Sequence, residues 1–281
     1  MAEIFVMSRG SLRRLLIRPR FWVSLLLALG CVLIVFSQIP AYLSAHEYKI
    51  QIVEPFMILL PGRFPQIIFL ISFLLLVGDI PFLFAGLETT VIRSSRKKWF
   101  AAQILSALGA AVLWLLFVLF CTILLFGRQI SIHNQWSAFL KAVARVPNAA
   151  YNVKMGLLNP TVNLFMEATP YRRFVWTFLF QLFLFWTISL WSLMFNVWTR
   201  RSYGCILTVG FWVIRRVVAD LEFYLKLDLS LISPLSLVDF CEHRLTAARA
   251  IYILLFFVVQ ICVLWSLSAL KLRQMDLSMS E

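Results

Sequence analysis

Residues 88–99 read ETTVIRSSRKKW, a short basic segment that lies between two long apolar runs. The run before it, residues 67–86, is interrupted at residues 78–81 by glycine, aspartate and proline, whereas the run after it, residues 100–126, is almost unbroken. No other segment of the chain is a short basic stretch of this kind between two long apolar runs. We therefore interpret residues 88–99 as a cytoplasmic connector that contacts a partner.

The composition is that of a membrane protein. Of the 281 residues, 62% are hydrophobic and only 14% are charged, and the surface of a soluble domain needs more charge than this. A helix crosses a hydrocarbon core of about 30 Å with about 20 apolar residues, so runs of that length can be counted directly. The sequence predicts an all-α, polytopic membrane protein with a single transmembrane domain over residues 1–281. The six predicted spans are residues 21–40, 66–86, 100–126, 174–198, 203–222 and 250–270.

Residues 2–20 are predicted to form an amphipathic helix at the cytoplasmic membrane surface. Two compatible interpretations are a basic flank that orients the first span and an elbow helix packed against the bundle. A cleavable signal peptide is not expected, because the first apolar run begins only at Phe21 and no small-residue cleavage site follows it. The apolar stripe of the helix carries Ile4, Phe5, Leu12, Leu15 and Leu16, with Arg9, Arg13 and Arg20 on one flank and Arg14 and Arg18 on the other.

Three longer segments are expected on the outer side of the membrane. Residues 41–65 are interpreted as a polar loop, residues 128–173 as a long external loop, and residues 221–249 as short re-entrant or interfacial helices. The long external loop contains apolar residues at i, i+3, i+4 and i+7, a pattern typical of a second interfacial helix. These residues are Trp136, Phe139, Leu140 and Val143, whereas Ser137, Lys141 and Arg145 are expected to face away from them.

The positive charge indicates topology and not nucleic-acid binding. The net charge is +13, but the lysines and arginines gather at the ends of apolar runs and not on a soluble face. Half of the 26 cations lie on the side that holds residues 88–99 and both termini, although the loops of that side are short. The positive-inside rule therefore predicts a multi-pass protein of the cell (plasma) membrane with both termini in the cytoplasm.

Asp79 lies near the far end of the second predicted span, where an ionised carboxylate is costly. It should be hydrated or paired close to the membrane interface, with Arg93 or Lys97 as the expected partner. A second interpretation is favoured over a transport role: residues 78–81 form a helix kink whose freed carbonyl groups need a local donor.

The fifth predicted span contains Arg215 and Arg216 only about a dozen residues after it begins. Either the helix continues through them to about residue 222, or the segment is broken and re-enters the membrane. On a continuous helix Arg216 and Asp220 are spaced i, i+4 and could form an ion pair.

The chain lacks the motifs of the common catalytic sites. It contains no G-x-x-x-x-G-K-[ST] phosphate loop, no H-E-x-x-H pair and no G-x-S-x-G elbow. Its histidines, His46, His133 and His243, are isolated and lack metal-ligand spacing. We therefore expect a protein that is not an enzyme, with no cofactor or metal of its own and with any ATP hydrolysis supplied by a partner subunit.

Two segments of the sequence point to a known family of membrane proteins. In residues 78–105, GDIPFLFAGLETTVIRSSRKKWFAAQIL, an acidic residue precedes an arginine-bearing amphipathic connector and a third span that opens on an aromatic, and residues 232–236 read ISPLS. With these segments the layout resembles the permease subunit of ABC-2-type ATP-binding cassette transporters, in which a Ser-Pro-Leu turn often precedes the last helix. The long loop over residues 128–173 departs from the usual short one.

The resemblance implies that residues 88–99 are a coupling helix seated in a groove of a cytoplasmic ATPase, which would bind ATP and Mg. It also implies a second permease copy or paralogue, with membrane lipid around both. The alternative is an ordinary positive-inside loop of the same composition. The implied coupling residues are Glu88, Arg93, Arg96, Lys97, Lys98 and Trp99, and the polar residues of a possible substrate path are Asp79, Arg215, Arg216 and Asp220.

Two classes of function follow from these features. The first is an exporter permease that forms the translocation path and couples it to the ATPase. The second is a non-transporting membrane scaffold or sensor that binds a peptide or envelope component and recruits a soluble partner. In the second class Arg215 and Arg216 would anchor lipid headgroups by snorkelling, which is the commoner fate of arginines at this depth.

Overall fold

The computed structural model describes residues 2–60, 63–80, 95–145, 168–199, 204, 206, 210, 234–238 and 246–274. These residues are mostly helical. Among them, four helices are long and apolar enough to cross a membrane by length and composition: Pro19–Phe36, Lys97–Phe126, Pro170–Thr199 and Ala247–Lys271. They indicate a multi-pass membrane protein.

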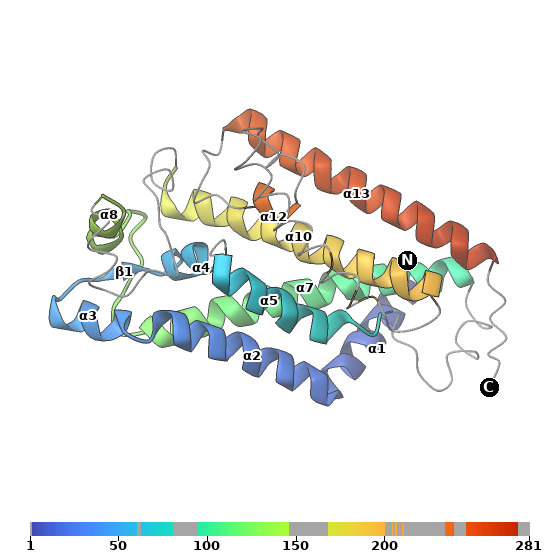
Figure 1. Cartoon of the computed structure of the whole chain (residues 1–281), viewed down its shortest axis with the longest axis horizontal. Helices are drawn as coiled ribbons and strands as arrows, with labels where there is room; N and C mark the ends of the chain where they lie inside the picture. Colours follow the sequence, from blue (N-terminus) through green and yellow to red (C-terminus); the bar gives the residue numbers. More distant parts are fainter. Residues whose placement is uncertain are drawn as a thin grey trace.

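The long helices run along the long axis of the molecule, and short elements gather at one end (Figure 1). Helix α13 lies on the outside of the bundle against α10. In chain order the elements are α1 (Ala2–Ile17), α2 (Pro19–Phe36), α3 (Ile39–Ala45), β1 (Ile50–Gln51), α4 (Glu54–Leu59), α5 (Arg63–Val77), α7 (Arg96–Phe126), β2 (Ile130–Ser131), α8 (Ala138–Arg145), α10 (Pro170–Thr199), α12 (Pro234–Leu237) and α13 (Ala247–Gln274).

The predicted spans and the observed helices differ most at the second and fifth positions. Helix α5 ends at Val77, well before the predicted end of the second span at residue 86, and is too short to count among the long helices. The fifth span, residues 203–222, lies outside the described residues except for residues 204, 206 and 210. The other predicted spans correspond to α2, α7, α10 and α13.

An aromatic cluster around Trp114 forms the centre of the bundle. The Trp114 ring on α7 lies 5.4 Å from Phe69 and 5.7 Å from Phe73 on α5, and 4.7 Å from Phe185 on α10, between centroids. Its indole nitrogen donates to Ser72 Oγ at 3.1 Å, and Ser72 Oγ donates to the Ser24 carbonyl on α2 at 2.8 Å. Edge-on rings and hydrogen bonds between helices stabilise packing in lipid, where hydrophobic association is weak.

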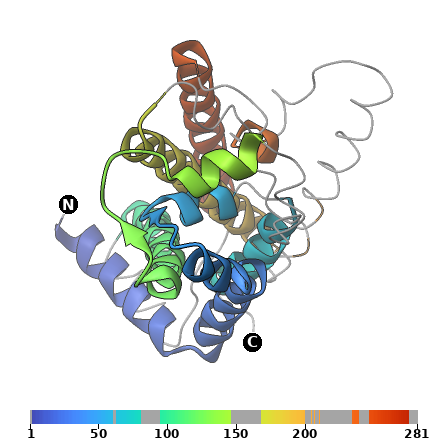
Figure 2. The ribbon, with the colours of Figure 1, turned by 90° about the vertical axis from the view of Figure 1, so that its left-hand side faces the viewer.

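Helix α1 turns across the bundle. Figure 1 shows α2 along the long axis, whereas in Figure 2 α2 is seen nearly end-on and α1 along its length. Ser106 Oγ on α7 lies 3.2 Å from Ser8 Oγ, and a Cβ added at Gly109 would lie 2.8 Å from Leu12 Cδ1, so α1 packs directly on α7. The side of α1 that is buried carries Ser8, Ser11 and Leu15, whereas two residues of the predicted apolar stripe, Phe5 and Leu16, are exposed.

The short elements α3, β1, α4, β2 and α8 form what we call the cap. Figure 1 shows the cap at one end of the bundle and α1 at the other. Residues 41–65, expected as a polar loop, instead supply much of α3, β1 and α4, and every residue of α4 is buried. Strand β1 pairs in parallel with β2, with Ile50 opposite Ile130.

The predicted second interfacial helix is α8, and its predicted apolar residues Phe139, Leu140 and Val143 are buried. One residue was placed wrongly: Ser137 does not face away but is 8% exposed. Its Oγ accepts the Leu140 backbone N–H at 3.1 Å, as expected of a helix N-cap, which explains why a polar residue lies on the buried side.

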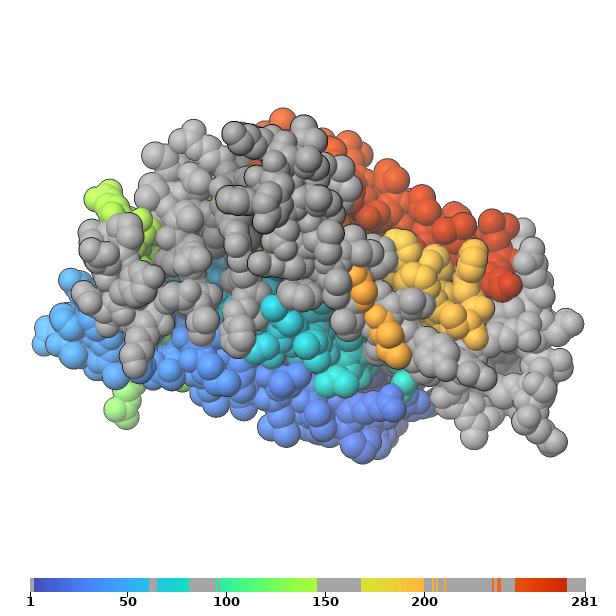
Figure 3. Space-filling model, viewed as in Figure 1, coloured from blue at the N-terminus to red at the C-terminus, as the bar shows by residue number. Residues whose placement is uncertain are grey.

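Helix α13 keeps a long apolar side at the surface. Figure 3 shows it along one edge of the molecule, and Ile251, Leu255 and Val259 are each more than half exposed. In a membrane protein such a side faces the lipid or another subunit.

Candidate functional site

Asp79 forms ion pairs with arginines from the start of the chain. Arg20 Nη1 lies 2.6 Å from Asp79 Oδ1 and 2.7 Å from Oδ2, and Arg18 Nη1 lies 3.3 Å from Oδ2. Arg18 connects α1 to α2 and Arg20 lies in the first turn of α2, whereas Asp79 follows the end of α5. The pairs therefore join the α1–α2 junction to the residues just before the connector.

The expected partners of Asp79 were Arg93 and Lys97, and the structure shows a different pairing. Lys97 makes no ion pair with Asp79 in the described structure, and Arg93 lies outside the described residues. The observed partner Arg20 is 59 positions away in sequence. Arg20 comes close to Asp79 because α2 and α5 pack side by side. This contact could not be predicted from residues that are near Asp79 in the sequence.

These ion pairs position the chain more than they stabilise it. The side chains of Arg18, Arg20 and Asp79 are 34%, 64% and 28% exposed. Pairs with such access to solvent contribute about 0–1 kcal/mol each, because water screens them and long side chains lose conformational freedom.

Asn196 on α10 holds the same turn from the other side. Its Nδ2 donates to the Gly78 carbonyl at 2.8 Å and to the Ile80 carbonyl at 2.5 Å, and its Oδ1 accepts the Gly204 N–H at 2.6 Å. The end of a helix leaves carbonyl groups without an intrahelical partner. Asn196 thus supplies a donor to the carbonyl groups of the turn that follows α5, and Pro81, on which the kink interpretation depends, lies outside the described residues.

The last residues of the connector are also tied to α1. Ser95 caps α7, with its Oγ accepting the Lys98 N–H at 3.4 Å, and Lys98 Nζ lies 2.7 Å from Glu3 Oε2. The hydrogen bond and charge of Lys98 lower the pKa of Glu3. Both flanks of residues 81–94 are therefore bound to the first residues of the chain, by Asp79 on one side and by Lys98 on the other.

Of the predicted connector, residues 88–99, the structure describes residues 95–99. Residues 96–99 form the first turn of α7, and Trp99 is only 3% exposed within the core. Trp99 is therefore unsuited to contact a partner, contrary to the expectation for a coupling residue. Lys97 is exposed and Lys98 is engaged with Glu3.

Several predicted residues cannot be placed. Glu88, Arg93, Arg215, Arg216 and Asp220 lie outside the described residues, and of Arg96 only the backbone is described. No group of three potential metal ligands occurs among the described residues.

A buried polar stripe along α10 was missed by the sequence reasoning. Its members are spaced mostly by four residues, so they lie on one broad side of the helix. The dense aromatic residues between them hid the periodicity, which a search for polar positions at i, i+4 could have found. Buried polar side chains in a membrane helix mark the bundle interior or a polar path. The stripe consists of Arg173, Thr177, Gln181, Ser189, Ser192 and Asn196, each at most 7% exposed.

A scan against protein-family models found no model that matches the chain, and searches of curated proteins and of solved structures found no match either. The resemblance to ABC-2-type permeases accordingly stays a prediction from the sequence layout.

Proposed function

We propose that this chain is the membrane-spanning permease subunit of an ATP-binding cassette exporter, driven by a separate cytoplasmic ATPase. The observation that carries the proposal is that the chain is attached to its first residues on both sides of residues 81–94. Asp79, ahead of the connector, contacts Arg18 and Arg20, and Lys98, near the end of the connector, contacts Glu3. Because of these contacts, a movement of the connector would also move α1 and the start of α2.

In this proposal the ATPase binds the connector through Arg93, Arg96 and Lys97, which offer their charges to acidic residues of the partner. Lys98 has a different role, because its ammonium group is already paired with Glu3 at 2.7 Å. ATP and Mg are bound by the partner, and a second permease copy or paralogue completes the path.

Closure of the ATPase would move the connector, and two sets of contacts would carry the movement inward. The arginine pairs with Asp79 lead to α1 and α2. Asn196, bonded to the carbonyls of Gly78 and Ile80, leads to α10 and its buried polar stripe. The stripe is the part of the described bundle best suited to line a path for an amphiphilic cargo.

The proposal is tested by reversing the charges of Arg93 and Arg96 together. The measurements are co-purification of an ATPase encoded beside this chain and the ATP turnover of the reconstituted complex in sealed vesicles. We expect the double variant to lose both, whereas Arg13→Glu, on the exposed side of α1, keeps both.

Unchanged co-purification and turnover in the double variant would overturn the coupling assignment. A scaffold or sensor, the alternative class, is recognised by a different result: the partner binds, but its ATP turnover does not respond to this chain.

A further inference from the structure

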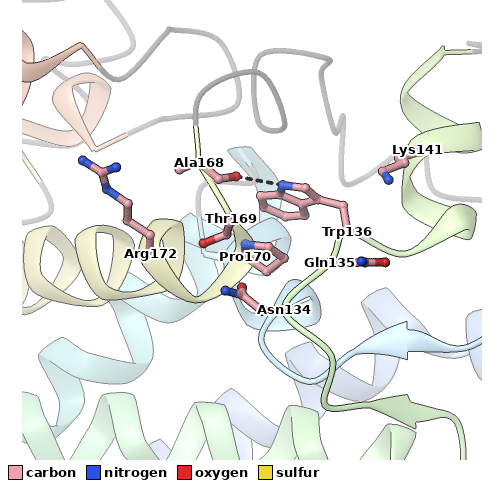
Figure 4. A pocket seen from close by; sticks show the side chains of 8 residues that line it. All are labelled: Asn134, Gln135, Trp136, Lys141, Ala168, Thr169, Pro170 and Arg172. Carbon is pink, nitrogen blue, oxygen red and sulfur yellow. Dashed lines mark hydrogen bonds between the residues drawn. The ribbon is translucent and has the colours of Figure 1, made fainter.

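A cavity of about 550 Å³ opens in the cap. Two segments wall it: the residues that lead into α8, together with Lys141, and the residues that begin α10 (Figure 4). Small-molecule sites commonly have volumes of about 300–1,000 Å³, so the cavity is large enough for a compact ligand. Its lining residues are Asn134, Gln135, Trp136, Lys141, Ala168, Thr169, Pro170 and Arg172.

The walls of the cavity are joined by hydrogen bonds. Trp136 Nε1 donates to the Ala168 carbonyl at 2.9 Å, and the Tyr171 N–H donates to Asn134 Oδ1 at 3.3 Å. Tyr171 Oη also donates to the Ile132 carbonyl at 2.6 Å. The relative position of the two segments is thereby fixed before any ligand arrives.

The lining carries two cations and no carboxylate. Figure 4 shows Lys141 and Arg172 on opposite sides of Trp136, so positive charge lies at both ends of the cavity lining. Within the described residues neither side chain makes a hydrogen bond or ion pair. The nearby Glu54 is fully buried, and its oxygens already accept backbone N–H groups. The first turn of α10 adds a positive helix dipole on the same side.

We infer that this cavity binds an anionic group, a phosphate or a carboxylate, on a molecule that also has an apolar part. Arginine and lysine are the side chains that bind such groups, arginine through two parallel hydrogen bonds and lysine as a point charge. The indole of Trp136 and the ring of Pro170 supply apolar surface beside the charges. The cap lies where the long helices end. In a membrane protein this is the level of the lipid headgroups, where aromatic side chains are enriched. The anion can therefore come from a lipid headgroup or from a free solute.

The test compares the double variant Lys141→Ala/Arg172→Ala with Arg145→Ala, which removes an exposed cation of α8 outside the cavity. One arm measures the binding of inorganic phosphate to the chain in nanodiscs of phosphatidylcholine. The other measures how much phosphatidylglycerol, relative to phosphatidylcholine, stays bound to the chain in detergent, by native mass spectrometry.

We expect about a tenfold or greater loss of binding in at least one arm for the double variant, and none for Arg145→Ala, because each charge-assisted contact is strong. Loss in the phosphatidylglycerol arm, with or without loss in the phosphate arm, identifies a headgroup, and loss in the phosphate arm alone identifies a free solute. Arg172→Lys keeps the charge and should keep part of the binding. Equal binding by the double variant, Arg145→Ala and the unmodified chain in both arms overturns the inference. Size-exclusion profiles check that every variant is folded, and Lys141→Ala and Arg172→Ala alone replace the double variant if it is not.

Discussion

Glu54 joins the two halves of the cap through one carboxylate. Its Oε2 accepts the Gln51 N–H at 3.1 Å and its Oε1 accepts the Ser137 N–H at 2.7 Å. Burial raises the pKa of Glu54 above its ordinary value of 4.5, although the hydrogen bonds from Ser137 and Gln51 and the charge of Lys141 act in the opposite direction. Glu54 therefore holds its proton more strongly in the folded cap than in the unfolded chain.

A pH dependence of stability follows from the raised pKa of Glu54. A group whose folded-state pKa is raised contributes stability that is complete below the unfolded pKa and is lost as the pH rises through the folded value. We expect the thermal unfolding midpoint to fall as the pH rises from below 4.5 toward neutrality, and Glu54→Gln to flatten this slope. Glu47→Gln, at an exposed glutamate of the cap, should leave the slope as it is. An unchanged slope in Glu54→Gln would contradict the assignment.

Replacement of Asn196 should weaken the turn before the connector. Asn196→Ala removes the donor to the Gly78 and Ile80 carbonyls and the acceptor of the Gly204 N–H, and unsatisfied buried groups cost about 1–3 kcal/mol each. We expect a loss of about 2 kcal/mol or more in unfolding free energy. Asn196→Asp keeps the acceptor but sets a carboxylate oxygen against the Gly78 and Ile80 carbonyls, so its loss should be at least as large as that of Asn196→Ala. Equal stability of all three proteins would show that the amide contributes nothing.

At the scale of elements, the packing of α1 on α7 can be tested by cross-linking. Ser8 and Ser106 face each other with 3.2 Å between their hydroxyl oxygens, close to the geometry that a disulfide needs. We expect Ser8→Cys/Ser106→Cys to form an intrachain disulfide under mild oxidation, identified by mass spectrometry of the linked peptides. The matched pair Arg9→Cys/Ser106→Cys should not, because Arg9 is exposed on another side of α1. Equal cross-linking of both pairs would mean that α1 does not keep this orientation.

The polar stripe of α10 makes a second prediction at this scale. If the stripe lines a path, Gln181→Cys should react with a water-soluble maleimide in membranes when ATP and the partner are present. Leu190→Cys, equally buried but on the opposite side of α10 against α13, should stay protected. If both cysteines stay unreactive under all conditions, the stripe does not line a path and its polar side chains only pack between helices.

At the scale of the whole molecule, the long helices could be predicted and the contacts between distant segments could not. Hydropathy over about 20 residues locates α2, α7, α10 and α13, because the bilayer imposes this length on any span. The end of α5 at Val77 was missed, since apolar residues continue past the turn that Asn196 stabilises. Apart from α8, the cap escaped prediction because its strands have only two residues each and its buried Glu54 is satisfied by Ser137, 83 positions later.

The exposed side of α13 tests whether the whole bundle is surrounded by lipid. Val259, 59% exposed, lies near the middle of the helix. A lysine at the centre of a lipid-facing helix costs about 2.5–3.5 kcal/mol of insertion free energy. We expect Val259→Lys to reduce the membrane-inserted fraction in a translocon assay, and Val259→Ala to leave it nearly unchanged. Full insertion of Val259→Lys would indicate that this side of α13 faces water or protein.

The contacts of α1 also set an order of events during synthesis. Arg18 and Arg20 can pair with Asp79 as soon as α5 and the turn after it have left the ribosome, before α7 is made. Glu3 and Ser8 must wait for Lys98 and Ser106, which follow in α7. The start of the chain thus forms its contacts in two successive steps, and most of the connector is synthesised between these two steps.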